Sequence, residues 1–193
     1  MSRRAETVPL DSGSEDTRFA ELYRRYYRPI HAYCRRRLAS DTVDDAVAEV
    51  FLTAWRRLPE VPDGDSALMW LYRTAHHVVG NQWRGAARYR RLKARMRTVV
   101  DQSVLPADET VLDHDACRIV LDAIARLGRT DVEVLLLTAW ERLSVAEIAV
   151  VLNISPNAVA QRLHRAHRNL GREYRRLQTQ PISTPEAPTG GTR

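Results

Sequence analysis

The stretch LSVAEIAVVLNISPNAVAQRLHRAHRNL, residues 143–170, has the pattern of two helices joined by a tight turn. Ser144 with Glu147 three positions later is typical of a capping box, in which each side chain bonds the backbone N–H of the other residue. Asn153 follows the first helix and tolerates the left-handed backbone that the turn requires. Pro156 then stands at the first position of the second helix, where its missing N–H costs nothing. Because these features agree, the stretch predicts a helix-turn-helix.

The second of these helices has an apolar side and a basic side, and Ser155 is a suitable cap for it. Its apolar residues recur at spacings of three and four and predict the side that packs inward: Val159, Leu163, Ala166 and Leu170. The opposite side suits duplex DNA, because glutamine can bond adenine and arginine can bond guanine in the major groove. A solvated basic helix in an ordinary bundle would carry the same charges. The candidate duplex-binding residues are Asn157, Gln161, Arg162, His164, Arg165 and Arg168.

The composition places this pair of helices in an all-α chain. With 193 residues the chain can form one domain of ordinary size or two small ones. Only 8 glycines and a 7% aromatic share argue against an all-β fold. The formal net charge of +6 fits a polyanionic partner without identifying one. Among the 30 basic residues only Lys93 is not arginine, which suits phosphate and guanine binding but also follows from GC-rich codon usage.

Periodicity divides the chain into two helical blocks. Residues 1–17 and 178–193 are polar and without period, and we expect both to be disordered tails. Residues 18–97 form a first helical block, and residues 98–114 are acidic and expected to be a flexible linker. Residues 115–177 supply four helical segments that include the helix-turn-helix. The expected fold is therefore two small helical domains joined by a linker.

Within the first block, apolar residues recur at helical spacing over about residues 18–38, 43–58 and 66–97. Pro29 predicts a kink or a break in the first of these helices. The run PEVPDGD, residues 59–65, is typical of a loop.

Charge in the first block is strongly segregated. Residues 41–65 carry seven acids and two arginines, whereas residues 84–97 carry seven basic residues and no acid. Aromatic residues precede the basic run, and rings interleaved with cations suit single-stranded nucleic acid, where bases stack and phosphates meet arginine. Burial is the competing explanation, since Tyr72 and Trp83 also lie on the apolar side of their helix.

The sequence contains one pattern that could bind a metal. The pairs His31/Cys34 and His114/Cys117 each place two potential ligands one helical turn apart, and together they could form a tetrahedral zinc site. Cysteine on a helical apolar side is more often a small buried residue, so we assign no metal and no cofactor. No Gly-rich phosphate loop or complete catalytic set is recognisable, which predicts that the chain is not an enzyme. No segment resembles a signal peptide or a membrane span of ~20 apolar residues, so we expect a cytoplasmic protein.

The order of these parts resembles the extracytoplasmic-function (ECF) sigma factors of bacterial RNA polymerase. The resemblance is carried by DDAVAEVFLTAWRRL (44–58), a Pro/Gly loop, ALMWLYRTAHHVVGNQWRGAARYRR (67–91), an acidic linker and the helix-turn-helix. It covers about residues 18–176. It implies an alternative sigma factor that binds core RNA polymerase and directs promoter recognition and transcription initiation through the −10 and −35 elements. Relatives are often held inactive by an anti-sigma factor.

The resemblance also implies roles for individual residues. The residues expected to dock on the clamp helices of the largest polymerase subunit are Asp44, Asp45, Glu49, Phe51 and Trp55. Those expected to meet the −10 element and help open it are Trp70, Arg73, His76, His77, Asn81, Arg84 and Arg88. The loop 60–67 would hold a base flipped from the locally melted promoter, and the recognition helix would bind the −35 element as duplex.

Four positions depart from the family pattern. His77 stands where asparagine is frequent, Asn81 where aspartate is frequent, and Ala160 where a basic residue is common, which puts the promoter sequence in doubt. Ala48 replaces a frequent glutamine in the docking helix, which could weaken docking slightly. Two alternatives stay open. One is an autonomous helix-turn-helix regulator that binds an operator alone, and the other is an enzyme or metalloprotein that uses the His/Cys pairs.

Overall fold

The computed structural model describes residues 12–94 and 114–179, and all regular elements in these two ranges are helices. This confirms the all-α fold. The predictions for residues 1–11, for the linker as far as residue 113 and for residues 180–193 lie outside the described residues.

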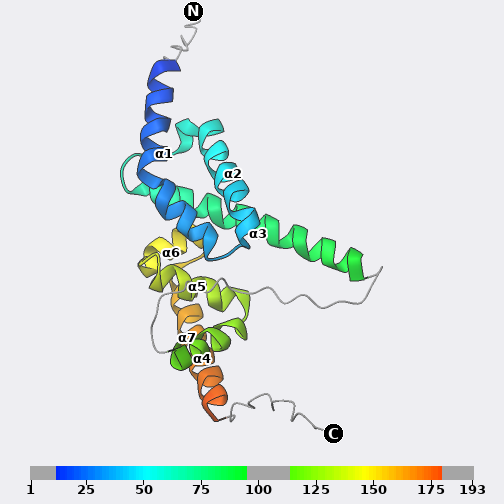
Figure 1. Ribbon diagram of the computed structural model, residues 1–193. Helices are drawn as coiled ribbons and strands as arrows, with labels where there is room; N and C mark the ends of the chain where they lie inside the picture. The colour runs from blue at the N-terminus through cyan, green and yellow to red at the C-terminus, as the bar shows by residue number, and fades with distance from the viewer. Residues whose placement is uncertain (1–11, 95–113, 180–193) are drawn as a thin grey trace, which may run out of the picture.

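The first module contains three long helices and two 3₁₀ turns (Figure 1). They are α1 (Ser12–Arg35), η1 (Ser40–Thr42), α2 (Val43–Arg56), η2 (Leu58–Glu60) and α3 (Ser66–Ala94). Each long helix packs against the other two. The predicted loop of residues 59–65 contains the end of η2 and then turns into α3.

One expectation for α1 needs correction, and another is narrowed. The helix begins at Ser12, so the prediction of an unstructured tail through residue 17 is wrong for residues 12–17. Extending an existing helix fixes one residue per added hydrogen bond, so these exposed turns need no apolar side of their own. Pro29 lies inside α1, which excludes the predicted break and leaves the predicted kink as the alternative. The helix continues because Tyr26, Ile30 and Tyr33 on either side of Pro29 are buried in the core.

The second module contains the four predicted helices. They are α4 (His114–Ala125), α5 (Arg129–Ala139), α6 (Val145–Leu152) and α7 (Pro156–Thr179). The long α7 packs along α4, α5 and α6. It continues to Thr179, two residues beyond the expected end of the domain.

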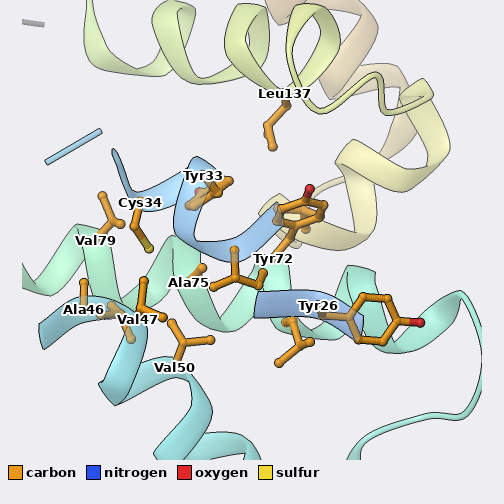
Figure 2. Packing of buried hydrophobic residues seen from close by; sticks show 14 of the residues in the cluster. Tyr26, Tyr33, Cys34, Ala46, Val47, Val50, Tyr72, Ala75, Val79 and Leu137 are labelled. Carbon is orange, nitrogen blue, oxygen red and sulfur yellow. The ribbon is translucent and has the colours of Figure 1, made fainter. Parts of the chain in front are cut away.

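The two modules share one buried apolar cluster, which the sequence pattern did not predict. Helix α6 lies against α3 (Figure 1). Leu137 of α5 is fully buried and points toward Tyr33 and Tyr72 of the first module (Figure 2). Ile148 of α6 belongs to the same cluster. Each small module removes more apolar surface from water by packing on the other, which favours their association.

Candidate nucleic-acid interface

Helices α6 and α7 form the predicted helix-turn-helix. The Ser144 backbone N–H donates to Glu147 Oε2 at 2.8 Å, and the Glu147 backbone N–H donates to Ser144 Oγ at 3.3 Å. The hydrogen bonds from the Ser144 hydroxyl and backbone lower the pKa of Glu147. Asn153 has φ +53°, in the left-handed region. The Ala158 backbone N–H donates to Ser155 Oγ at 3.2 Å. Helix α7 begins at Pro156, so all four local predictions for this motif are confirmed.

The start of α7 presents a polar, basic surface. Val159 and Ala166 are fully buried, while Leu163 is half-buried, which confirms the predicted inward side. Five of the six candidate duplex-binding side chains are exposed: Asn157, Gln161, His164, Arg165 and Arg168. Arg162 is half-buried and lines a pocket against the first module.

One residue beneath this surface was missed by the sequence analysis. Asp131 of α5 is buried, and its Oδ1 accepts a hydrogen bond from Arg165 Nε at 3.3 Å. Its Oδ2 accepts one from Asn169 Nδ2 at 2.7 Å. An ionised acceptor strengthens such bonds and orients the donor, so Asp131 holds Arg165 in one direction. Asp131 lies 34 residues from Arg165 in the chain, and no local pattern could have paired them.

Helix α3 presents a second cationic surface. Its exposed candidates are Arg73, His77, Asn81 and Arg84, and their spacings of four and three place them on one side of the helix. Arg84 donates a hydrogen bond to Asn81 Oδ1. Partial burial and then the positive charges of His76, Arg73 and Arg84 lower the pKa of His77. Trp70 is half-buried, and Arg88 belongs to α3 but its side chain lies outside the described residues. The clustered cations favour a polyanion here.

Two aromatic residues of α3 face the second module instead of solvent. His76 Nδ1 lies 3.5 Å from Glu133 Oε1 of α5. Trp83 Nε1 donates to the Arg37 carbonyl oxygen at 3.0 Å, and the Arg129 guanidinium carbon lies 3.9 Å from the centroid of the Trp83 ring. Both the indole N–H and the ring face of Trp83 therefore have partners within the protein. This agrees with the explanation that Trp83 packs inside the protein and does not stack on a base.

A polar group between the modules, here called the inter-module cluster, consists of Tyr33, Arg36 and Arg37 of the first module with Glu133 and Glu141 of the second. Arg37 Nε donates to Glu133 Oε2 at 2.9 Å and Arg37 Nη1 donates to Glu141 Oε1 at 3.0 Å. The Tyr33 hydroxyl donates to Glu133 Oε1 at 2.9 Å, and Arg36 Nη2 donates to Glu141 Oε1 at 2.8 Å. The side chains of Arg37 and Glu141 are 1% and 0% exposed.

The charges of this cluster stabilise one another. Burial alone would raise the pKa of the Glu133 carboxyl, but the Arg37 guanidinium and a hydrogen bond from His76 outweigh it and lower that pKa to about 2. Burial opposes the charge of Arg37, yet the neighbouring Tyr33, Glu133 and Glu141 raise its pKa above the ordinary value. No local sequence pattern reveals this cluster, because its members are about 100 residues apart in the chain.

Helix α2 presents an acidic surface next to an aromatic ridge. Asp44, Asp45 and Glu49 are exposed, and Trp55 is 41% exposed. Phe51 is only 3% exposed, so it supports the ridge from below instead of forming its surface.

The ridge continues onto α1. The ring of Phe19 lies edge-on to the ring of Trp55, with the two ring centroids 5.0 Å apart. The ring centroids of Tyr23 and Phe51 are 4.7 Å apart. Tyr23 and Leu52 are exposed neighbours that the sequence analysis did not select. An exposed apolar ridge beside acids suits a protein partner with apolar and basic groups.

The His31/Cys34 pair gains no support as a zinc site, whereas the side chains of His114 and Cys117 lie outside the described residues. Within the two described ranges no group of three or more His, Cys, Asp and Glu side chains has a metal-binding arrangement. Burial raises the pKa of the Cys34 thiol to about 12, so Cys34 packs as a small apolar side chain. His31 Nε2 lies 3.7 Å from Asp44 Oδ1. No helix in the described part of the chain is long and apolar enough to span a bilayer.

The fold and these surfaces define an all-α DNA-binding protein with two modules. Two family models match the chain: Sigma-70 region 2 over residues 22–89 and Sigma-70, region 4 over residues 117–170. The chain is similar to the RNA polymerase sigma factor YlaC of Bacillus subtilis (strain 168), with 30% identity over 152 residues, or 78% of this chain and 88% of that protein. It is also similar to the ECF RNA polymerase sigma factor BldN of Streptomyces coelicolor, with 28% identity over 175 residues, 89% of this chain and 66% of that protein.

A solved structure shares the fold. The sigma factor RpoE, in complex with the anti-sigma factor NepR from Bartonella quintana, superposes with a TM-score of 0.64 at 17% identity, covering 84% of this chain and 98% of that chain. The chain belongs to the sigma-70 family of RNA polymerase sigma factors and is of the ECF type. It is an alternative sigma factor that acts in promoter recognition and transcription initiation, and the autonomous-regulator alternative is not favoured.

Proposed function

We propose that this sigma factor contacts core RNA polymerase and the promoter through three separate surfaces. The surface on α2, with Asp44, Asp45, Glu49 and Trp55, docks on the clamp helices of the largest polymerase subunit. The exposed side of α3, from Arg73 to Arg84, meets the −10 element as it opens. The exposed side of α7 reads the −35 element as duplex DNA.

The main observation in support of this proposal is that one chain has two cationic surfaces, one suited to duplex DNA and one suited to unstacked bases. On α7 a capped helix-turn-helix presents glutamine and arginine, the side chains that read base edges in duplex DNA. On α3 arginine, histidine and asparagine line one side of a helix next to the loop 60–67, which suits phosphates and unstacked bases. The α2 surface has the opposite sign, which keeps protein docking and DNA binding apart.

The same proposal covers partners and location. The sigma factor acts in the cytoplasm as an initiation factor and not as an enzyme. Two similar solved structures are complexes, one of the sigma factor RpoE with the anti-sigma factor NepR and one of CnrH with the cytosolic domain of CnrY. An anti-sigma protein that covers the α2 surface is therefore proposed as a partner of this chain.

Transcription-start mapping tests the proposal. Purified chain is added to the core RNA polymerase of its own host, and the 5′ ends of transcripts from genomic DNA are sequenced. We expect new starts that share two conserved elements, and none from core polymerase alone. The absence of defined starts would refute the proposal, as would tight operator binding by the free chain.

A further inference from the structure

The loop after η2 is tied to α1 by one arginine. Arg18 Nη1 donates to the Leu58 carbonyl oxygen at 3.0 Å, and Nη2 donates to the Val61 carbonyl oxygen at 2.6 Å. Nη2 also lies 2.9 Å from Asp63 Oδ1. A planar guanidinium can bond two carbonyls and a carboxylate at once, which an ammonium group cannot do in the same geometry. Arg18 therefore holds Leu58, Val61 and Asp63 in fixed positions relative to α1.

A second tie comes from Tyr26. This residue is buried, and its hydroxyl donates to the Gly64 carbonyl oxygen at 2.9 Å. Gly64 has φ +64°, a conformation that other residues rarely adopt, so the turn needs a glycine at this position. The hydrogen bond from Tyr26 holds the carbonyl group of this glycine in place. Arg25 pairs with Asp65 at 3.1 Å, but this pair is largely exposed and holds the loop weakly. A hollow of about 160 Å³ lies between α1 and the loop.

We propose that Arg18 is a positioning residue for promoter opening. This rests on the proposed function, together with the role that the family resemblance implies for the loop 60–67, namely to hold a base flipped out of the promoter. Unstacking a base costs free energy that the receiving loop must offset, and a preformed loop loses less conformational freedom on binding. Arg18 precedes residues 22–89, the part matched by the Sigma-70 region 2 model, so the family match does not assign it a role.

The test uses Arg18→Gln in full-length protein on a promoter found by start mapping. We expect core binding and the thermal melt to stay near wild type, while the rate of open-complex formation, followed by permanganate reactivity, falls about tenfold. A template melted in advance should recover much of the loss, and Arg18→Lys should recover only part of it. Arg25→Gln is the matched control on the same loop and should open the promoter normally.

Tyr26→Phe removes the second tie and keeps the ring in the core, so it tests the proposal even if Arg18→Gln fails to fold. Normal opening by a folded Arg18→Gln or by Tyr26→Phe overturns the proposal. An equal loss on duplex and melted templates also overturns it, because opening would then not be the affected step. Failure of the proposed function is distinguishable, since wild type would then show no defined starts.

Discussion

The charge of Glu133 makes the stability of this sigma factor depend on pH in a specific way. In the folded chain the pKa of Glu133 is about 2, against an ordinary value of 4.5. Because the folded pKa is the lower one, the carboxylate contributes its full stability above pH 4.5, and this contribution is lost as the pH falls from 4.5 toward 2. We predict that Glu133→Gln removes this dependence.

The magnitude follows from the gap between the two pKa values. A gap of about 2.5 pH units corresponds to about 3 kcal/mol at pH 7, since each unit is worth about 1.4 kcal/mol. Proton linkage reduces the contribution to about 2 kcal/mol at pH 3.5, where the unfolded carboxyl is already largely protonated. The difference in unfolding free energy between wild type and Glu133→Gln should therefore shrink by about 1 kcal/mol between pH 7 and pH 3.5.

Urea unfolding followed by far-ultraviolet circular dichroism measures this difference at a series of pH values. The control is Glu60→Gln, which removes an exposed carboxylate paired with Arg57 and should change stability little at any pH. A gap between wild type and Glu133→Gln that stays constant from pH 7 to pH 3.5 would refute the reasoning, because Glu133 would then not be held ionised by Arg37.

Three further predictions concern the DNA and polymerase surfaces, and a fourth concerns the helix cap at Ser144. Arg165→Ala should weaken binding to a −35 duplex by about 1–3 kcal/mol, measured by fluorescence anisotropy, and an unchanged affinity would place it off the interface. Asp131→Asn should lower the same affinity by less, and adding it to Arg165→Ala should cost little more; fully additive losses would show that the two act independently. Asp45→Arg should impair pull-down with core polymerase while the circular dichroism spectrum stays unchanged, and normal association would remove Asp45 from the docking surface. Ser144→Ala should lower the unfolding free energy by about 1 kcal/mol in urea through loss of the capping box, and equal stability would mean that the cap is immaterial.

Much of the candidate site could be predicted because its features are local. The capping box at Ser144, the left-handed Asn153 and the buried Val159 each depend on residues within one or two helical turns. The same holds for the exposed side of α3, where spacing alone places Arg73 and His77 together. Phe51 shows the limit of this approach. Its aromatic ring fits a docking surface by type, but the packing of α1 against α2 buries it.

The helices, their caps and the motif that contacts DNA were determined by the sequence itself, because helical period and terminal hydrogen bonds connect residues that are close along the chain. Tertiary structure alone decided that Asp131 orients Arg165, that Arg18 holds the loop before α3, and that Arg37 meets Glu133 and Glu141 between the modules. These contacts join residues 34 to 104 positions apart. They form only when buried apolar surfaces bring the helices together. Between the modules this packing also excludes water from Arg37, Glu133 and Glu141, so these groups bond to one another.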